Sequence, residues 1–389
     1  MSELKNVIVV YDSGYVNGGA AKVAINTAVS LSEETNLNIC YFCATGPVCP
    51  QLLDSKVKCT CLNIPDINHR KKIDTFFSGI FNKHVYKAFK NYLWNFSNQN
   101  TILHIHGWSH SLSSSILKAS NDLKFKRVIT LHDYFVCCPN GGFLNYRKME
   151  ICHRKPLSPQ CVFCNCDKRN YIQKVWRVLR QRRQNRYLSE KENFIYLSEL
   201  SKSVIEKSYP KAHYYYYPNS IDRFSYHSNG LEGKDSFLYL GRLSEEKGIR
   251  LFCEAITKAS AKGIVIGDGE LREELEKKYT NIEFLGWMNK AQIEQVLPRV
   301  KALIFPSLWY EVSPLTVPEM LSAGIPCIVS DCCAAKDNIV PEENGYLFQA
   351  GSSENLASVI KNFYVNDFSY KRQSDSIEVL TDIYSLLIR

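Results

Sequence analysis

The chain has 389 residues, of which 45% are hydrophobic and 22% are charged. These proportions describe a globular protein, and the length excludes a single ordinary core and predicts two domains. The formal net charge of +9 favours anionic partners such as nucleotides, nucleic acid or a lipid surface.

The first residues, MSELKNVIVVYDSGY, are a hydrophilic lead followed by a short apolar run that predicts a strand. No basic segment precedes a long apolar one, so a signal peptide is not expected. No apolar run approaches the roughly 18 residues of a membrane-spanning helix. Fifteen cysteines without an export signal indicate a reducing cytosol.

Short β-rich runs then alternate with helical patterns. The expected strands of the first half are NVIVVYD, LNICYFCA, TILHIHG and RVITLHD, with helices at 20–32 and 111–120 between them. A second series begins near residue 236 with SFLYLGR, GIVIGDG, IEFLGW, ALIFPS and PCIVSD. The alternation predicts an α/β fold of two doubly wound, Rossmann-like domains with parallel sheets.

The expected domain boundaries follow from this pattern. An N-terminal domain spans 1–218, a linker rich in loop formers spans 219–235, and a C-terminal domain spans 236–372. A last helix at 373–389 is expected to pack back on the N-terminal domain. Ligands bind at the carboxyl ends of strands in such sheets, so two domains facing each other would form a cleft.

Two glycines follow the first strand in SGYVNGGAAK. Gly18 and Gly19 open a helix, where backbone can approach a ligand closely and amides favour an anion. The spacing is not the GxGxxG fingerprint, which argues against an NAD site. A glycine turn that only packs the helix on its strand is the alternative.

Histidines stand at later strand ends. His104, His106 and His110 follow one strand, and His132 with Asp133 follows the next. A lone histidine in such a place is usually structural, but several on one edge of a sheet indicate a polar site. Of these, His132 is the residue expected to touch substrate.

Cations and carboxylates mark the second half. Arg242 ends the strand SFLYLGR, and Lys247 follows in GRLSEEKG. A guanidinium and an ammonium together suit a diphosphate, although an ordinary solvated loop is the alternative. Glu311 and Glu319 then stand eight apart in SLWYEVSPLTVPEMLSAGIPCIVSD, the first in a loop and the second in a short apolar segment.

Together these stretches resemble the retaining glycosyltransferases of family four, of the glycosyl transferases group 1 type, which have the GT-B fold. The resemblance covers nearly the whole chain and is most specific over 237–348. Its motifs are GGA, HIHGW, TLHD, PNSID, GRLSEEKG, GDGE, FLGW, the Glu311–Glu319 pair and NGYLF.

The resemblance implies a metal-independent enzyme without a cofactor. It would transfer a hexosyl-type sugar from a UDP- or GDP-linked donor to a glycan or lipid-linked acceptor, with retention of the anomeric configuration. The setting would be bacterial cell-surface polysaccharide or lipopolysaccharide synthesis, in the cytoplasm at the inner face of the membrane.

The resemblance also implies roles for single residues. Glu319 would bind the ribose hydroxyls, and Glu311 would lie at the donor sugar. Arg242 and Lys247 would clamp the diphosphate, and His132 would position and stabilise the reacting sugar. The further implied donor contacts are Gly18, Gly19, Ser313, Leu315 and Thr316. Relatives often carry Gly-Gly where this chain has Cys332, Cys333 and Ala334, whose side chains would narrow that loop.

An insert at 136–167 contains six cysteines: Cys137, Cys138, Cys152, Cys161, Cys164 and Cys166. Four thiolates can form a tetrahedral zinc site, although this spacing fits no common zinc module. Reduced thiols that fix an acceptor-side loop are the other interpretation.

Residues 167–188 predict a basic amphipathic helix. Lysine and arginine occur eight times against one acid, Asp167. The apolar positions recur at helical spacing: Tyr171, Ile172, Val175, Trp176 and Leu179. This pattern is typical of a helix that lies on an anionic membrane, and a core helix with a solvated face is the alternative.

Two other functions use similar features. An NDP-sugar epimerase or hydrolase could share the fold, and a non-catalytic protein could bind anionic surfaces. The Arg242, Lys247, Glu311 and Glu319 set favours transfer over both. A nucleic-acid partner is not expected, because basic residues form no aromatic-interleaved stripe outside 167–188.

Overall fold

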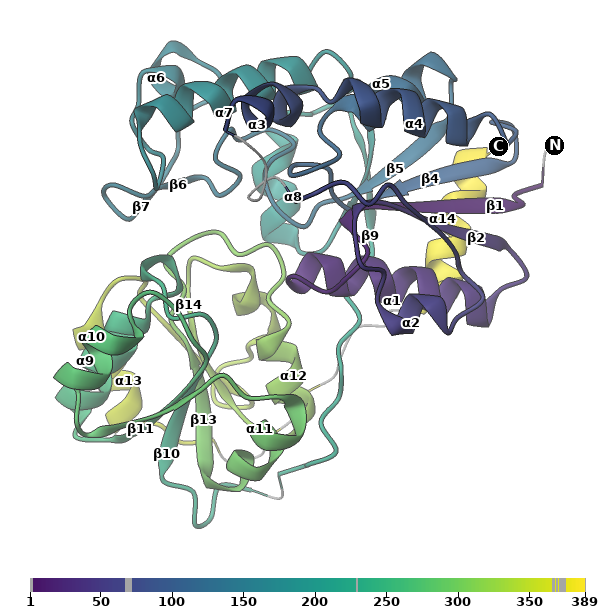
Figure 1. Cartoon of the computed structure of the whole chain (residues 1–389). Helices are drawn as coiled ribbons and strands as arrows, with labels where there is room; N and C mark the ends of the chain where they lie inside the picture. The colour runs from purple at the N-terminus through teal and green to yellow at the C-terminus, as the bar shows by residue number, and fades with distance from the viewer. Residues whose placement is uncertain are drawn as a thin grey trace. The chain divides into compact units, whose positions relative to one another are not determined.

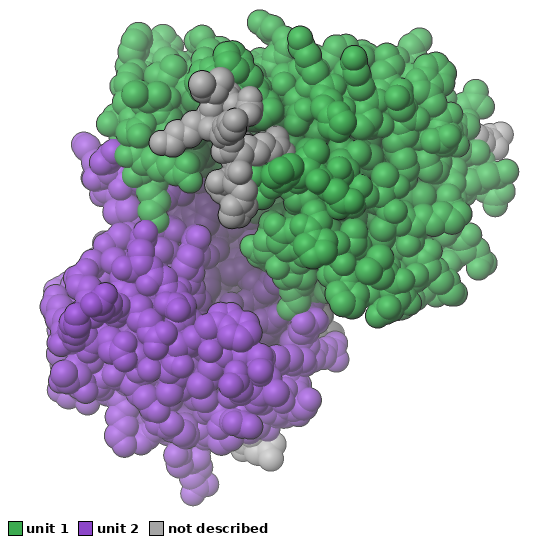
Figure 2. Space-filling model, in the orientation of Figure 1, with its two compact units in different colours: residues 1–141, 154–220, 374–389 green, residues 142–153, 221–373 purple. Residues whose placement is uncertain are grey.

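The structure, a computed structural model, describes residues 3–66, 72–228, 230–365, 368, 370 and 376–388. The chain forms two compact units (Figure 2). Unit 1 contains Met1–Gly141, Arg154–Ser220 and Ser374–Arg389, and unit 2 contains Gly142–His153 and Ile221–Gln373. The chain therefore leaves unit 1, builds most of unit 2, and returns.

This division differs from the expected boundaries at the hairpin of β6 (Leu144–Asn145) and β7 (Glu150–Ile151). The expected N-terminal domain included this segment, whereas the structure groups it with unit 2. Gly142 lies so close to Trp309 that an added Cβ would sit 3.2 Å from the indole ring. Aromatic packing thus holds part of the cysteine-rich insert to unit 2.

Unit 1 is built on a seven-stranded parallel sheet with the order β3-β2-β1-β4-β5-β8-β9. Its central strands are continuous buried apolar runs, as expected for a parallel sheet covered on both faces. The strands are β1 (Asn6–Ser13), β2 (Asn38–Thr45), β3 (Lys58–Cys61), β4 (Thr101–Ile105), β5 (Lys126–Thr130), β8 (Asn193–Tyr196) and β9 (His213–Tyr216).

The helices of unit 1 pack apolar residues on this sheet. In α1, for example, Ala21, Ala24, Ile25 and Ala28 recur at three- and four-residue spacing and are all buried. The helices are α1 (Gly19–Glu34), α2 (Pro50–Leu53), α3 (Lys72–Ile80), α4 (Lys83–Leu93), α5 (Ser115–Asp122), α6 (Pro159–Val162), α7 (Tyr171–Gln184), α8 (Glu199–Glu206) and α14 (Ile377–Ile388).

The C-terminal helix α14 belongs to unit 1 and packs against β4 and β5 (Figure 1). Its Tyr384 hydroxyl lies 2.6 Å from His104 Nδ1, and the other ring nitrogen of His104 lies 2.6 Å from the Thr130 hydroxyl. Both partners of His104 are thus within the core. His104 is a satisfied structural histidine.

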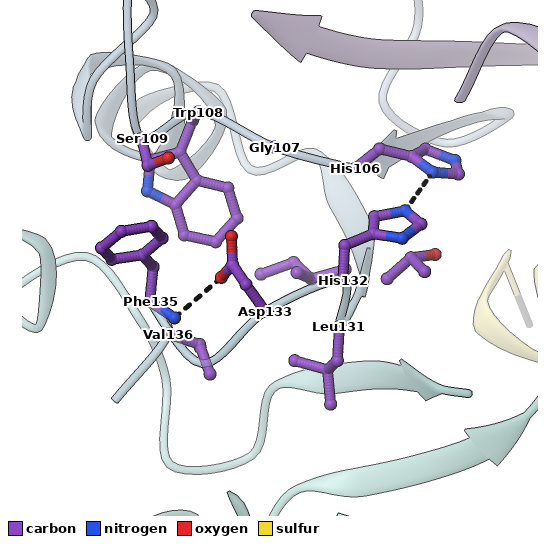
Figure 3. A pocket seen from close by; sticks show the side chains of 11 residues that line it. His106, Gly107, Trp108, Ser109, Leu131, His132, Asp133, Phe135 and Val136 are labelled. Atoms are coloured by element: carbon purple, nitrogen blue, oxygen red, sulfur yellow. Dashed lines mark hydrogen bonds between the residues drawn. The ribbon is translucent and has the colours of Figure 1, made fainter. Parts of the chain in front are cut away.

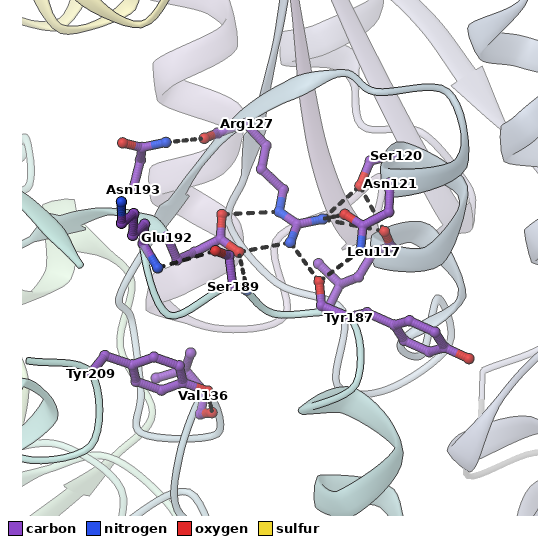
Figure 4. Close-up of polar contacts among 11 residues, drawn as sticks. Leu117, Ser120, Asn121, Arg127, Val136, Tyr187, Ser189, Glu192, Asn193 and Tyr209 are labelled. Atoms are coloured by element: carbon purple, nitrogen blue, oxygen red, sulfur yellow. Dashed lines mark hydrogen bonds and ion pairs between the residues drawn. The ribbon is translucent and has the colours of Figure 1, made fainter. Parts of the chain in front are cut away.

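A buried ion pair fixes β5 to the segment before β8 (Figure 4). Arg127 donates to both carboxylate oxygens of Glu192, at 3.1 and 2.7 Å. Its remaining donors reach the Tyr187 carbonyl and three oxygens near the end of α5: Leu117 O, Ser120 Oγ and Asn121 Oδ1. Every guanidinium donor therefore has a partner, which is the condition for such a pair to be tolerated in a core.

Helix α7 is attached to unit 1 by its polar side. Arg180 is buried and donates to the carbonyls of Ser109 and Pro139. Trp176 is also buried, and its Nε1 donates to Phe76 O at 2.8 Å. The prediction that Trp176 and the arginines lie on opposite sides of the helix is therefore wrong for Arg180, since both side chains are buried against unit 1. Loop carbonyls bind the Arg180 guanidinium, and a carbonyl of α3 binds the Trp176 indole.

Unit 2 is built on a six-stranded parallel sheet with the order β12-β11-β10-β13-β14-β15. A hydrophobic core lies on each face. The strands are β10 (Ser236–Leu240), β11 (Lys262–Ile266), β12 (Ile282–Gly286), β13 (Val300–Phe305), β14 (Cys327–Ser330) and β15 (Gly345–Phe348), and the helices are α9 (Ile249–Ala259), α10 (Arg272–Lys278), α11 (Lys290–Val296), α12 (Thr316–Ser322) and α13 (Ser353–Lys361).

Both sheets are doubly wound, which confirms the predicted fold class. In each unit the strand order reverses beside the first strand, between β1 and β4 in unit 1 and between β10 and β13 in unit 2. Loops on the two sides of such a point diverge and leave room for a ligand. The next residues after these strands are therefore the ones to inspect.

Candidate functional site

The switch point of unit 2 brings the predicted cations and the first predicted carboxylate to one loop cluster. After β10, Glu245–Lys247 form a 3-10 turn that ends at Gly248 in a left-handed conformation (φ 72°). A side chain at Gly248 is excluded, because its Cβ would lie 1.9 Å from the Pro306 carbonyl oxygen. The close approach of Gly248 to Pro306 places Lys247 next to the loop that follows β13.

Glu311 is the best-defined polar group of this cluster. It is 7% exposed, and its Oε1 accepts from Lys247 Nζ at 2.5 Å, from Ser307 Oγ at 2.9 Å and from Trp309 Nε1 at 3.2 Å. Within the described ranges Oε2 makes no hydrogen bond. Three donors thus hold one oxygen of the carboxylate, and the second keeps its capacity to accept from a ligand hydroxyl.

Arg242 lies at the mouth of the same cluster. Its side chain is 65% exposed, and one guanidinium nitrogen pairs with Glu246 at 3.1 Å. Tyr239 donates to the Arg242 carbonyl at 2.8 Å and fixes the backbone there. Arg242 is therefore anchored near its base and keeps donors in solvent, as an anion-binding residue requires.

The segment after Glu311 leads into α12. The helix begins at Thr316, so Pro314 lies outside it and Pro318 lies in the first turn, where a missing N–H breaks no helical bond. Glu319 closes the first i to i−4 bond, onto Leu315 O at 3.0 Å, and is half-buried. The expected donor residues Ser313, Leu315 and Thr316 form the stretch between the two glutamates.

The loop with Cys332 and Cys333 packs against the backbone of this cluster. The Cys332 sulfur lies 3.3 Å from the Ser307 carbonyl, and Cys333 is fully buried. Ala334 N donates to the Glu311 carbonyl at 3.1 Å. The side chains of Cys332 and Cys333, which stand where relatives often have Gly-Gly, thus point into unit 2. Together with Ala334 N, the loop contacts the backbone at Ser307 and at Glu311, before and after Trp309.

Unit 1 has its own polar pocket at the carboxyl ends of β4 and β5 (Figure 3). Its polar lining includes His106, Ser109, His132 and Asp133, and its apolar lining includes Trp108 and Phe135. The predicted convergence of strand-end histidines is partly realised, since His106 and His132 line the pocket whereas His104 faces α14. The pocket combines aromatic faces with a few polar groups, a typical ligand-site composition.

His106 and His132 form a neutral pair. His106 Nδ1 and His132 Nε2 share a hydrogen bond of 2.8 Å. Desolvation lowers the pKa of His132 to about 3 and holds the pKa of His106 well below its ordinary value. Within the described ranges the buried His106 Nε2 has no hydrogen-bond partner. At neutral pH this pair offers hydrogen bonds without charge.

Asp133 is the acidic group of the pocket. Burial raises the pKa of Asp133 to about 6, although the Phe135 N–H donates to its carboxylate at 2.8 Å and Arg180 is close enough to favour the charged form. Arg180 is itself fixed over the Phe135 ring, 4.4 Å from its centroid. The sequence marked Asp133 only as a neighbour of His132.

The glycines after β1 lie at the other side of the same switch point. Gly18 precedes α1 in an extended conformation and Gly19 begins it; both are exposed, and nothing lies within 4 Å of a Cβ built at Gly18. Asp12, at the end of β1, accepts from the backbone N–H groups of His110, Ser111 and Leu112. The Asp12 carboxylate thus fixes the loop that follows β4 and carries pocket residues.

The cysteine-rich insert contains a buried lysine. Lys174 is 1% exposed, and its ammonium lies 3.3 Å from the Cys166 sulfur and 3.6 Å from that of Cys161. Asn140 donates to the same Cys166 sulfur at 3.1 Å. Over the described ranges, no group of three or more His, Cys, Asp or Glu side chains is arranged to hold a metal ion.

Comparisons with known proteins agree with this architecture. Residues 234–366 match the family of glycosyl transferases group 1. The chain is 28% identical to a lipopolysaccharide 1,6-galactosyltransferase of Escherichia coli K12 over 151 residues, which is 36% of this chain and 42% of that protein. It is 26% identical over 179 residues to an Escherichia coli UDP-Gal:alpha-D-GlcNAc-diphosphoundecaprenol alpha-1,3-galactosyltransferase, covering 38% and 46% of the two chains.

The fold itself extends over the whole chain. The apo structure of the lipopolysaccharide outer core galactosyltransferase WaaB aligns with a TM-score of 0.58 and 18% identity, covering 98% of this chain and 100% of that one. The fold is thus GT-B. The chain spans less than half the length of the two curated relatives it matches. Among the described residues, no helix is both long and apolar enough to cross a membrane.

Proposed function

Residues 234–366 are a glycosyl transferases group 1 domain, and from that premise we propose that the protein is a retaining glycosyltransferase. It moves a hexosyl-type sugar from a UDP- or GDP-linked donor to a glycan or lipid-linked acceptor in the synthesis of a cell-surface polysaccharide or lipopolysaccharide. The observation that carries the proposal is the Glu311 carboxylate at the switch point of unit 2, held on one oxygen by Lys247 and free to accept on the other.

The donor binds to unit 2 in this proposal. Lys247 and Arg242 neutralise the diphosphate, and Glu311 Oε2 accepts a hydroxyl of the sugar. Glu319, in the first turn of α12, accepts from the ribose hydroxyls. Ser313, Leu315 and Thr316 contribute backbone contacts, and Gly18 and Gly19 of unit 1 complete the expected donor set. Two cations at the leaving group do the work that a metal ion would otherwise do.

The reaction conserves the anomeric configuration. The bond between the anomeric carbon and the diphosphate oxygen breaks, and the acceptor oxygen bonds to the same face of that carbon. The acceptor proton passes to the departing diphosphate oxygen, whose negative charge Lys247 and Arg242 stabilise. No covalent enzyme intermediate is required.

The pocket of unit 1 serves the reacting sugar and the acceptor. Because desolvation keeps the pKa of His132 near 3, its ring remains neutral and acts by hydrogen bonding. His132 therefore positions the reacting sugar and stabilises it by hydrogen bonding. Asp133 is the only carboxylate among the residues that line this pocket, and it can accept a hydroxyl of the acceptor.

The proposed place of work is the cytoplasmic face of the cell membrane, with the protein attached peripherally. Two observations support it. One curated relative is named for an acceptor linked to diphosphoundecaprenol, a lipid carrier. The chain also has a formal net charge of +9, which favours an anionic leaflet.

A donor screen followed by product analysis tests the proposal. Thermal shifts with UDP-, GDP- and ADP-sugars identify the donor, because a ligand of the folded state raises apparent stability. Proton NMR of the fresh glycoside should then show the donor's anomeric configuration, with unchanged rates in chelator. An inverted product, or hydrolysis without transfer to any acceptor, would contradict the proposal.

A further inference from the structure

Helix α7 presents a row of apolar residues to solvent. Ile172, Val175 and Leu179 follow one another along the helix and are 79%, 40% and 41% exposed. The side facing unit 1 carries the apolar residues Trp176 and Val178 and also the polar residues Lys174, Arg180, Gln181 and Gln184, all of them buried. An ordinary surface helix buries its apolar residues and exposes its polar ones, so the exposed apolar row and the four buried polar residues are unusual.

The buried polar residues explain why this arrangement is stable. Gln181 donates to Val136 O at 2.9 Å. Gln184 accepts from Trp108 Nε1 at 2.8 Å and donates to Phe135 O at 2.9 Å. With the carbonyl contacts of Arg180, these bonds attach α7 to unit 1. The outward apolar residues are therefore not needed to hold the helix in place.

Neighbouring elements extend the exposed apolar area. Phe163, just after α6, is 77% exposed, and Tyr171 of α7 donates to the carbonyl of the adjacent Val162. Helix α3 packs beside α7 and exposes Phe76 and Phe77, whose rings lie 5.3 Å apart. We call Phe76, Phe77, Phe163, Ile172, Val175 and Leu179 the apolar surface. Figure 1 shows α3, α6 and α7 along one side of unit 1.

Charge indicates what covers the apolar surface. Asp167, the acid just before α7, is 1% exposed and pairs with Arg177 at 2.7 Å. Residues 168–188 contain no acid, and Arg182 and Arg186 are exposed beyond Leu179, at the end of α7 and just after it. An exposed apolar row that continues into exposed cations matches a layer of lipid chains under anionic head groups.

We propose that the apolar surface inserts into the head-group region of an anionic membrane, with Arg182 and Arg186 on the lipid phosphates. The inference deepens the proposed function and rests on it for its purpose, because a lipid-linked acceptor is presented at that interface. It differs from the sequence expectation in its physical basis. Apolar insertion supplies the affinity, whereas Arg177 and Arg180 are engaged inside unit 1.

The test compares one triple variant and one double variant of the full-length protein with wild type in their binding to vesicles. Ile172→Ser, Val175→Ser and Leu179→Ser are combined in the stripe variant. The matched control combines Leu53→Ser and Trp94→Ser, which lie elsewhere on unit 1 and are 62% and 69% exposed. Partition is measured by co-sedimentation with phosphatidylcholine vesicles that contain phosphatidylglycerol.

The stripe variant should partition at least about tenfold less than wild type, because three side chains lose their apolar burial. The control should bind as wild type does. Binding of wild type should fall only partly at 1 M salt, where an electrostatic contact alone would be lost. Equal partition of stripe variant and wild type would overturn the proposal.

Two further measurements separate the alternatives. Wild type could instead fail to bind vesicles but form a dimer that the stripe variant does not form. In that case the apolar surface is an interface between two copies of the chain, and the membrane proposal fails. Turnover of a short soluble acceptor should be the same in wild type and stripe variant. Absence of any sugar transfer in both proteins would instead count against the proposed function and leave vesicle binding as a separate result.

Discussion

Lys247 connects the two sides of the switch point in unit 2, since it follows β10 and pairs with Glu311 after β13. Lys247→Ala should weaken binding of the nucleoside diphosphate by about 1.5–3 kcal/mol, the usual value of a charge-assisted hydrogen bond. Titration calorimetry measures it. Lys262→Ala is the matched control, because Lys262 is 73% exposed and pairs with Asp235 at the start of β10. Unchanged affinity in Lys247→Ala would remove the diphosphate assignment.

Asp133 allows a prediction in which stability and activity change in opposite directions. Burial raises the pKa of Asp133 to about 6 from 3.8, so the folded state holds the proton more tightly and loses stability as pH rises through this interval. Asp133→Asn should therefore be more stable than wild type at pH 7.5. The shift in pKa sets an upper limit of about 3 kcal/mol, and the gain should be smaller than this because solvent screens the partly exposed carboxyl. The gain should vanish below about pH 4.

Urea unfolding at the two pH values checks that prediction. Transfer activity should fall in the same variant, because a neutral amide replaces the charged carboxylate that we propose to accept a hydroxyl of the acceptor, while donor binding stays intact. His110, Arg180, Asp12, Tyr11 and Cys137 are charged or titratable groups that interact with Asp133. A variant with lower stability at pH 7.5, or with full activity, would show that Asp133 is only structural.

Single residues of the site differ in how well sequence predicts them. Glu311 and Lys247 stand in motifs with fixed spacing, so the resemblance could mark them. Trp309 stands two residues before Glu311 in the same stretch, yet the sequence does not predict that its indole donates a hydrogen bond to that carboxylate. Such a bond depends on how the loop after β13 folds back, and that depends on contacts with Gly248 and Cys332 from elsewhere in the chain.

At the scale of elements, the pair Arg127–Glu192 ties β5 to the loop before β8. Arg127→Met should destabilise the fold by about 3–5 kcal/mol, because it leaves a buried carboxylate without its cation. Chemical unfolding measures the loss. Lys211→Met is the comparison, since the Lys211–Glu190 pair is exposed and solvent screening should leave the stability of that variant close to that of wild type. Similar losses in both variants would mean that burial does not decide the strength of these pairs.

Strands were easier to predict than the orientation of helices. The central strands read as continuous apolar runs, and there the local pattern suffices because both faces of each sheet are covered. The short strands β3, β8, β9 and β15, which have four residues each, are not predicted from the sequence. The sequence predicts the position of α7 along the chain but not which of its sides is buried. Its partners are carbonyls of Ser109, Phe135 and Val136 in distant loops, and a helical periodicity argument has no access to hydrogen bonds made over such separations.

At the scale of the whole molecule, α14 closes unit 1 from the far end of the chain. Tyr384 is fully buried and loses both its ring contacts and its bond to His104 when replaced by alanine. Tyr384→Ala should cost about 3–5 kcal/mol. Leu386→Ala on the same helix, where the side chain is 59% exposed, should change stability by less than about 0.5 kcal/mol.

The measurement is differential scanning calorimetry with and without the nucleoside diphosphate. If the loss is confined to unit 1, the ligand should still stabilise unit 2 of Tyr384→Ala, since the site residues there are untouched. A Tyr384→Ala protein as stable as wild type would show that the Tyr384 contacts of α14 do not contribute to the stability of unit 1.

The return of the chain to unit 1 also sets an order of events during translation. Ribosomes release the N-terminal strands first, and domains generally fold in that order. Here β4 and β5 must wait for residues 377–388 before His104 finds Tyr384, whereas the whole sheet of unit 2 has already been synthesised. The N-terminal unit is thus the last to be completed. While the ribosome synthesises the second unit, the nascent chain exposes the part of the first sheet that α14 later covers on β4 and β5, and apolar surface exposed in this way is prone to aggregation.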